Sequence, residues 1–355
     1  MAQIVSKSIL VAQGELLEFV RGCLAKAGLP EADARLVADS LVASNLRGID
    51  SHGVARLPHY LNRIKHGSIN PRPQIKAHQH GPALARVDGD HAMGQLAMQR
   101  ATEEAIALAR SAGAGWVAVE NSTHCGALAF FALEIARAGM IALAFSHSDS
   151  FVVPFGGKYP FCGTNPLCFA APAENGKAMC LDMATSVVPW NTISNAAIEG
   201  VTIPEGWAVD SEGKSTTDPK AAKAVLPFGD YKGSGLGLMV DVFCTALLGS
   251  PFGPGIAAMY GDPAKQRLLG GLVGAIDISK FRPVDDFRRT ITEMMRQWNA
   301  QERAQPDEPI LYPGQPEEME RERRLAKGIP VGVNLVAIFA KLSAELGVPW
   351  HVETN

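Results

Sequence analysis

The sequence contains no apolar stretch of the length that crosses a membrane. A membrane-spanning helix needs roughly 18–20 consecutive apolar residues, and polar or charged residues interrupt every apolar run of this 355-residue chain before that length. The first seven residues also lack the basic segment and the following apolar segment of a secretory signal. We therefore expect a cytoplasmic protein that does not associate with membranes.

A strong charge of one sign is also absent. The chain has 33 basic and 36 acidic residues and a formal net charge of -3 at pH 7, which gives no electrostatic reason to expect nucleic acid as a partner. Its 35 glycines and 23 prolines indicate many turns within an ordinary globular composition. A chain of this length forms one large domain or two ordinary ones.

Cysteine pairs and metal-ligand clusters are missing. The six cysteines form no CxxC pair and show no zinc-ligand spacing, which is typical of reduced thiols in a cytoplasm. His52, His59 and His66 recur every seven residues, but on one helix neighbouring imidazoles would lie about 10 Å apart, too far for one ion. We expect no metal site, and this argues against a metal-dependent hydrolase.

The Rossmann dinucleotide fingerprint is absent as well. Residues 233–238 read Gly-Ser-Gly-Leu-Gly-Leu, so Leu238 stands where GxGxxG requires its last glycine, and no apolar strand precedes the segment. The glycines at 270–274 fail in a similar way. These absences count against an ordinary Rossmann dehydrogenase, but they do not exclude every nicotinamide enzyme.

Apolar periodicity divides the chain into a helical part and a part that alternates strands with helices. It predicts N-terminal helices at 15–27, 32–46 and from His52 to 64, and a C-terminal helix at 331–346 that packs back on them. Between these parts it predicts strands at 83–87, 115–119, 141–145, 166–171, 178–181 and 270–278, and helices at 95–112, 127–138 and 233–248. The charged segment 302–322 is expected to be a surface excursion. We predict an α/β fold with a non-Rossmann α/β domain over 76–304 and a helical domain formed by 1–75 with 305–355.

A histidine, an arginine and a tyrosine recur at helical spacing near the N-terminus. His52, Arg56 and Tyr60 are four residues apart, so a helix that begins at His52 would present them as one stripe. An imidazole beside a fixed cation and a phenol suits a small carboxylate whose neighbouring carbonyl or hydroxyl exchanges a proton. A solvent-exposed helix face with a capping histidine explains the same pattern.

Further polar residues stand at the ends of expected strands. His124 lies between a strand and a helix, where α/β proteins place ligands, or it caps that helix. The turn-rich loop that contains Asn165 can direct backbone amides at an anion, or it is an ordinary connection. Asp182 can orient an imidazole or cap the next element. Lys232, before a helix, suits a phosphate but also occurs there without a ligand.

Six motifs in order resemble the malate/L-lactate dehydrogenase family, which is unrelated to the Rossmann lactate and malate dehydrogenases. The resemblance covers nearly the whole chain, and runs at 203–210 and 248–253 are similar to the ureidoglycolate dehydrogenases of this family. The motifs are Arg-Gly-Ile-Asp-Ser-His-Gly at 47–53, Val-Pro-Phe-Gly-Gly at 153–157, Gly-Thr-Asn-Pro-Leu at 163–167, Asp-Met-Ala-Thr at 182–185, Lys-Gly at 232–233 and Tyr-Pro-Gly at 312–314.

The resemblance implies a distinct nicotinamide-binding fold and a homodimer with its site near the subunit interface. It implies that His52 is the proton donor to the substrate carbonyl and that Arg56 grips the carboxylate. His124 would lie in the same site, and in ureidoglycolate dehydrogenases the matching histidine is taken as the proton acceptor. Gln315 would belong to the cofactor site, although many relatives have glutamate there. The other implied cofactor contacts are Ser148, Asp182, Met183, Ala184, Lys232, Pro313 and Gly314.

We therefore predict reversible hydride transfer between NAD or NADP, with NAD favoured, and C2 of a small 2-hydroxy or 2-oxo acid of the malate, lactate or ureidoglycolate type. Asp182 is expected to hold the imidazole of His52, and Ser51, Tyr60 and Asn165 to contact the substrate. One alternative is a reductase of a cyclic imine such as Δ1-piperideine-2-carboxylate, because the same donor can protonate an imine nitrogen. Another is a catalytically silent protein that binds small acids.

Overall fold

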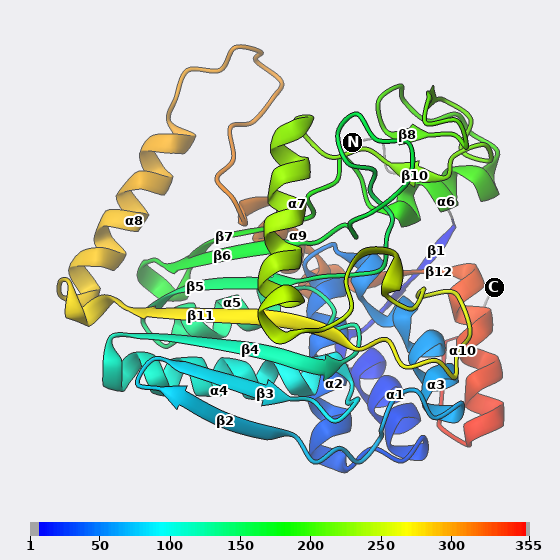
Figure 1. Cartoon of the computed structure of the whole chain (residues 1–355), viewed down its shortest axis with the longest axis horizontal. Helices are drawn as coiled ribbons and strands as arrows, with labels where there is room; N and C mark the ends of the chain where they lie inside the picture. The colour runs from blue at the N-terminus through cyan, green and yellow to red at the C-terminus, as the bar shows by residue number, and fades with distance from the viewer. Residues whose placement is uncertain (1–6, 353–355) are drawn as a thin grey trace.

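The computed structural model describes residues 7–352 and centres on a seven-stranded mixed sheet (Figure 1). The strand order is β2-β3-β4-β11-β5-β6-β7, and only β3 and β4 run parallel. The strands are β2 (Lys76–Gly81), β3 (Leu84–Asp88), β4 (Ala114–Ser122), β5 (Met140–Ser146), β6 (Leu167–Pro172), β7 (Ala178–Met183) and β11 (Leu269–Asp277).

Helices cover both faces of this sheet. Two of them, α4 (Gly94–Ala112) and α5 (Ala129–Arg137), pack on one face through buried alanines, whereas α7 (Tyr231–Cys244) crosses the other face in front of β11 (Figure 1). Gly270 in β11 permits the close approach of α7, because a Cβ at that position would lie 2.4 Å from the carbonyl oxygen of Cys244. The layered α/β architecture predicted from the sequence is confirmed.

Several neighbouring strands, β4, β5 and β7, end on the same side of the sheet. Ser122 at the end of β4 pairs with Leu269 at the start of β11, and Met183 at the end of β7 pairs with Leu167 at the start of β6. Since β5 ends at Ser146 between them, the loops that contain the expected site residues leave the sheet on the same side. Ligands bind at such an edge in many α/β proteins.

The N-terminal and C-terminal helices share a separate hydrophobic core. The ring of Phe19 packs against Phe339 and Trp350, with centroids 5.1 and 4.7 Å apart, so the predicted packing of the last helix on the first ones is confirmed. The helices are α1 (Gln13–Lys26), α2 (Glu31–Leu46), α3 (Leu57–Lys65) and α10 (Val333–Leu346). The short strands β1 (Ser8–Val11) and β12 (Ile329–Gly332), which the sequence analysis did not predict, pair antiparallel beside them.

Several other elements escaped the sequence analysis. A three-stranded sheet and one helix form a small cluster of their own around Ile193 and Val225. They are α6 (Trp190–Glu199), β8 (Ala208–Val209), β9 (Ser215–Thr216) and β10 (Ala224–Val225), and α8 (Val284–Asn299) packs elsewhere, on β6.

Two expectations about helices were wrong in part. The segment 302–322 is not a surface excursion throughout, because α9 (Gln315–Lys327) begins inside it and buries the side chain of Arg324. His52 does not open a continuous α-helix. Residues Asp50–His52 (η1) and Val54–Arg56 (η2) form two 3₁₀ turns separated at Gly53, and the α-helix starts at Leu57. None of the helices formed by residues 7–352 has the length and apolar character needed to span a bilayer.

Candidate active site

The break at Gly53 sets the position of His52. Asn45 of α2 accepts a hydrogen bond from the Val54 N–H at 2.7 Å through Oδ1 and donates one to Asp50 at 2.5 Å through Nδ2. Its side chain fills the space beside Gly53 so completely that a Cβ there would lie 2.1 Å from Oδ1. The glycine is therefore required by a close approach, and the two 3₁₀ turns follow from it.

Arg56 is almost wholly buried, with 8% of its surface exposed, and its guanidinium is held from two sides. Nε donates to the carbonyl oxygen of Ser51 at 2.6 Å, and Nη1 donates to the hydroxyl of Tyr260 at 2.9 Å. Tyr260 in turn donates to Asn191 of α6 at 3.1 Å. These groups line a recess of about 1000 Å³ between α6 and the terminal segments, so Arg56 presents a fixed positive charge to this recess.

The imidazoles of His52 and His124 lie face to face, although 72 residues separate them in the chain. Their ring centroids are 5.4 Å apart and their planes are inclined by 27°. Tyr60 reaches His124 from α3, with 2.7 Å between the hydroxyl and Nδ1, while Ser51 Oγ lies 2.9 Å from Nδ1 of His52. The structure thus brings together five of the residues singled out in the sequence, even though they do not form one helical stripe.

The electrostatics of this cluster keep its imidazoles neutral. Burial and the neighbouring charge of Arg56 lower the pKa of His52 to about 4. The pKa of His124 is also held well below its usual range by burial, and then by His52, Arg56 and Arg267. Burial raises the pKa of the Tyr60 hydroxyl. Neutral imidazoles at neutral pH are available as proton acceptors as well as hydrogen-bond donors.

A segment near residue 260 completes the site, and the sequence analysis did not single it out. Asp149 accepts a hydrogen bond from the Met259 N–H at 2.9 Å and forms a buried ion pair with Arg267. Arg63 of α3 donates to the carbonyl oxygens of Ala258 and Met259 at 3.1 and 2.9 Å. The only available signal was indirect: Asp149 follows the histidine and serines that end β5, a position expected for ligand contacts.

Two residues expected to contact substrate or its histidine lie elsewhere. Asp182 accepts a hydrogen bond from the Ala129 N–H at 2.8 Å, at the start of α5, and has no hydrogen bond to His52 in the described structure. Asn165 is fully buried; it donates to the Gly237 carbonyl and to Asp241, both at 2.9 Å, and accepts from the Ser148 N–H at 3.2 Å. The structure therefore does not bring Asn165 to the imidazole cluster, and its contacts suit a role in holding the Ser148 backbone.

The expected cofactor residues lie in two places: near the side of the sheet where β5 and β7 end, and along the outer side of β7. Ser148 follows β5, Met183 and Ala184 are half-buried at the end of β7, and Lys232 is exposed in the first turn of α7. The Pro313 carbonyl accepts a hydrogen bond from Cys180 N–H at 2.9 Å, which extends the edge of β7. Gly314 has φ +92°, and a Cβ there would lie 2.9 Å from the Cys180 carbonyl oxygen. Gln315 accepts from Tyr312 N–H at 3.2 Å and closes the turn.

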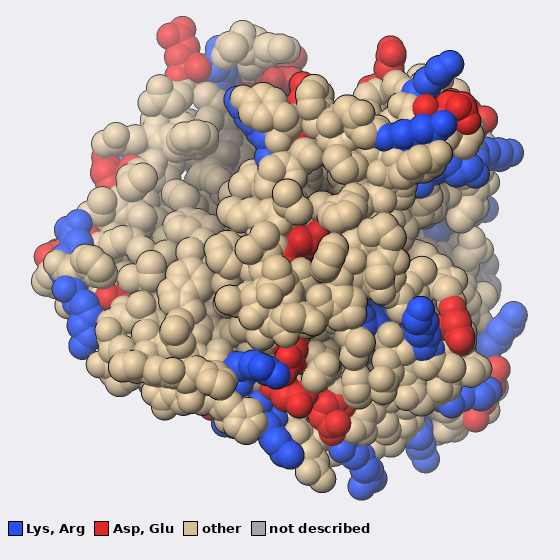
Figure 2. Space-filling view, in the orientation of Figure 1, with Lys and Arg blue, Asp and Glu red and all other residues tan. Residues whose placement is uncertain are grey.

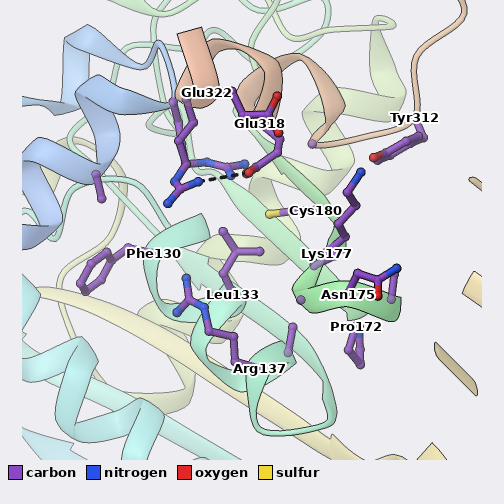
Figure 3. A pocket seen from close by; sticks show the side chains of 18 of the residues that line it. Phe130, Leu133, Arg137, Pro172, Asn175, Lys177, Cys180, Tyr312, Glu318 and Glu322 are labelled. Atoms are coloured by element: carbon purple, nitrogen blue, oxygen red, sulfur yellow. Dashed lines mark hydrogen bonds and ion pairs between the residues drawn. The ribbon is translucent and has the colours of Figure 1, made fainter. Parts of the chain in front are cut away.

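A second recess of about 680 Å³ adjoins this turn, between α5, the outer edge of β7 and α9 (Figure 3). Arg137 and Lys177 enter it from opposite sides, and Lys177 points toward Tyr312. Neither Arg137, Lys177 nor Arg47 forms an ion pair within residues 7–352, whereas Arg321 is paired with Glu318 at 3.2 Å. This excess of positive charge beside the Gly314 turn fits the phosphates of a dinucleotide.

No group of three or more histidine, cysteine, aspartate or glutamate side chains within 7–352 is arranged to hold an ion. The six cysteines are free and buried. The cluster around His52 and His124 consists of imidazoles, a guanidinium group and hydroxyls, which can exchange protons and bind an anion.

Comparison with known proteins agrees with this class. The sequence matches the malate/L-lactate dehydrogenase family over residues 11–339. It is 38% identical to a ureidoglycolate dehydrogenase (NAD(+)) of Escherichia coli O157:H7 over 321 residues, 90% of this chain and 92% of the relative. It is 37% identical to a malate dehydrogenase of Pyrococcus abyssi over 351 residues, 96% of each chain.

A solved structure gives the same result. The sulfolactate dehydrogenase of Methanocaldococcus jannaschii superposes with a TM-score of 0.89 at 34% identity, covering 96% of this chain and 98% of that one. The chain belongs to the malate/L-lactate dehydrogenase family. It is an NAD(P)-dependent oxidoreductase, and the names of its relatives specify NAD(+) in one case and NADP(+) in another.

Proposed function

We propose that this enzyme transfers a hydride reversibly between a nicotinamide and C2 of a small 2-hydroxy or 2-oxo acid. Arg56 beside the paired imidazoles of His52 and His124 carries this proposal, because it places an anchor for a carboxylate next to groups that exchange a proton. The relatives named for ureidoglycolate, malate and sulfolactate support acids with a second polar group. We therefore favour such acids over lactate.

Arg56, His52 and Ser51 have separate roles in this reaction. Arg56 holds the substrate carboxylate and so fixes which face of C2 meets the cofactor. His52 takes the hydroxyl proton during oxidation and returns it during reduction. The bound nicotinamide supplies the hydride acceptor or donor. Ser51 orients His52 through the contact at 2.9 Å.

The cofactor proposal rests on two groups of residues. Ser148, Asp182 to Ala184 and Lys232 lie near the ends of β5 and β7 and the start of α7, and those cations of the recess beside the Gly314 turn that form no ion pair within residues 7–352 suit a pyrophosphate. We propose NAD as the preferred nicotinamide, supported by the ureidoglycolate dehydrogenase (NAD(+)) relative. Isothermal titration with NAD and NADP measures the preference without turnover, and tighter binding of NADP would reverse it.

We also propose a homodimer that covers the outer face of α7. Leu238, Val242 and Leu247 on and beside this helix are exposed by 51, 51 and 62%, and the face of the molecule over α7 carries few charged side chains (Figure 2). Apolar surfaces of this kind are typical of subunit contacts. Light scattering gives the mass, and a monomer at micromolar concentration would refute the dimer.

A substrate panel tests the activity. The absorbance at 340 nm is followed with either nicotinamide and with malate, lactate, sulfolactate, ureidoglycolate and a cyclic imine carboxylate. We expect turnover of the hydroxy acids with a second polar group. His52→Ala should abolish turnover while nicotinamide binding persists, and a rate within a few-fold of the parent would refute its role. Activity with the cyclic imine alone would favour the alternative of an imine reductase. No activity with any compound would favour a catalytically silent protein that binds small acids.

A further inference from the structure

A chain of hydrogen bonds runs from a buried amide to the second imidazole of the site. Gln95 of α4, with none of its surface exposed, donates through Nε2 to the hydroxyl of Tyr60 at 3.2 Å. Tyr60, 1% exposed, lies 2.7 Å from Nδ1 of His124. A phenol has a single proton. Because the hydroxyl accepts from the amide, it directs its own proton to His124.

A second contact agrees with this direction. The backbone N–H of Gly126 also points at Nδ1 of His124, at the longer distance of 3.4 Å. A backbone N–H cannot accept a hydrogen bond, so this contact agrees with a lone pair on Nδ1 of the neutral ring, the state that the short contact with Tyr60 stabilises. The ring proton of His124 is then on Nε2. An amide turned the other way would instead accept from Tyr60 and place the ring proton on Nδ1, which conflicts with the Gly126 contact.

His52 has no such constraint. Its Nδ1 contacts only the hydroxyl of Ser51 in the described structure, and a serine hydroxyl accepts a hydrogen bond as readily as it donates one. With the proton on Nδ1, His52 presents the lone pair of Nε2. The two stacked imidazoles can therefore differ: one offers an N–H and the other a lone pair.

We propose that Gln95 and Tyr60 are positioning residues that hold His124 as a hydrogen-bond donor and leave proton transfer to His52. This assignment deepens the proposed function and rests on it. During oxidation the hydroxyl proton of the substrate passes to Nε2 of His52 and the hydride leaves C2 for the nicotinamide. The C2–O bond becomes a carbonyl. Throughout, the Nε2–H of His124 donates to that oxygen and accepts no proton.

The surroundings of Gln95 point to the same role. Its Oε1 is buried and has no hydrogen-bond partner among residues 7–352, and the same holds for the hydroxyl of Ser40 nearby. A Cβ on Gly126 would lie 3.5 Å from Gln95 Nε2 and 3.6 Å from Ser40 Oγ. A buried amide with an unpaired oxygen is a cost to folding. Gln95 donates its hydrogen bond to Tyr60, which belongs to the site. An apolar side chain of equal length would fill the same space without the cost of a buried amide, so packing alone does not explain the glutamine.

The experiment reads the tautomer of His124 directly. The full-length enzyme is labelled with ¹⁵N in its histidine rings, and the signals of His124 are assigned by their loss in His124→Asn. We expect the parent to show a neutral ring protonated on Nε2. Gln95→Met should release Tyr60 and populate the Nδ1–H tautomer. Its kcat for the acid should fall about tenfold with KM within about twofold, the loss expected when one orienting hydrogen bond is removed.

A matched variant controls for general damage to α4. Gln99→Met changes the same residue type one turn along the helix, where Gln99 bonds to Glu103 and Glu134 and not to the site. It should leave the tautomer and kcat unchanged, and thermal unfolding confirms that both variants fold. A parent ring protonated on Nδ1, or a Gln95→Met enzyme that matches Gln99→Met in both readouts, would overturn the inference. Absence of turnover with every acid would refute the proposed function instead and leave the tautomer measurement standing.

Discussion

Arg324 holds Asp50 through two hydrogen bonds, at 2.6 and 3.0 Å, across 274 residues of sequence. The guanidinium is 2% exposed and also donates to the Asn45 carbonyl at 2.7 Å. Since Asp50 begins the 3₁₀ turn that ends at His52, a residue of α9 fixes the turn that presents the first imidazole. The C-terminal segment is therefore part of the support of the active site.

Removal of the contacts between Arg324 and Asp50 should lower both kcat and the stability of the fold. In Arg324→Met we expect kcat for the acid to fall about tenfold and stability to fall by about 2 kcal/mol, because Asp50 loses its buried partner but stays partly solvated. Steady-state kinetics and urea unfolding measure the two effects. Arg296→Met is the control, since Arg296 of α8 pairs with Glu293 on the surface and lines neither recess. Equal kinetics in both variants would contradict the role of Arg324.

Gly53→Ala should damage the same turn from inside. The new Cβ would lie 2.1 Å from Asn45 Oδ1, so Asn45 must leave its hydrogen bonds to Val54 and Asp50. Overpacking of this kind costs roughly 1–3 kcal/mol, and we expect a lower melting temperature together with loss of kcat. Gly14→Ala is the control, because a Cβ there would meet open space and its backbone, like that of Gly53, does not have a positive φ. A Gly53→Ala enzyme as active as the parent would show that this close approach is dispensable.

Arg56→Lys tests the substrate anchor. Lysine keeps the positive charge but cannot bond Ser51, Tyr260 and a carboxylate at once. We expect KM for the acid to rise about 100-fold, which corresponds to the loss of roughly 2–3 kcal/mol in charge-assisted hydrogen bonds. The affinity for the nicotinamide, measured by titration, should change little. A KM equal to that of the parent would mean that the carboxylate binds elsewhere.

Much of the fold followed from apolar periodicity, because strands such as Met140–Ser146 and helices such as Gly94–Ala112 bury regular faces. Periodicity failed where contacts distant in sequence decide the structure. Gly53 breaks the expected helix because Asn45 occupies the space beside it. In α9, the buried side chain of Arg324 forms ion pairs with Asp50 and Glu320. A segment with a charged sequence therefore forms a helix that packs against α2.

The site was predictable to a similar extent. His52, Arg56 and Tyr60 were singled out because they recur every four residues, and His124 because it stands between an expected strand and an expected helix. Tyr260 and Gln95 carry no such signal, since one reaches Arg56 from a loop and the other is an amide inside an alanine-rich helix. The burial of Asn165 was equally hidden, because its partners Gly237 and Asp241 lie more than 70 residues away.

The depressed pKa of His52 predicts that carboxylate binding takes up a proton. In the free enzyme its pKa is about 4, lowered by burial and then by Arg56, so the ring is neutral at pH 5.5. A bound carboxylate such as oxamate offsets the charge of Arg56, the second of these causes, and so raises the pKa of His52 above its value in the free enzyme. Binding should therefore tighten as the pH falls from 7 toward 5, because the complex holds a proton that the free enzyme lacks.

Calorimetry in buffers of different ionisation enthalpy measures this uptake. At pH 5.5, with the nicotinamide bound, we expect a fraction of a proton to be taken up per oxamate, and the uptake should disappear in His52→Asn. Persistence of the uptake in that variant would assign it to another group, and no uptake in the parent would contradict the coupling of Arg56 with His52. The coupling gives the substrate a function beyond orientation. An arriving 2-oxo acid would help to protonate the imidazole that must then donate a proton to it.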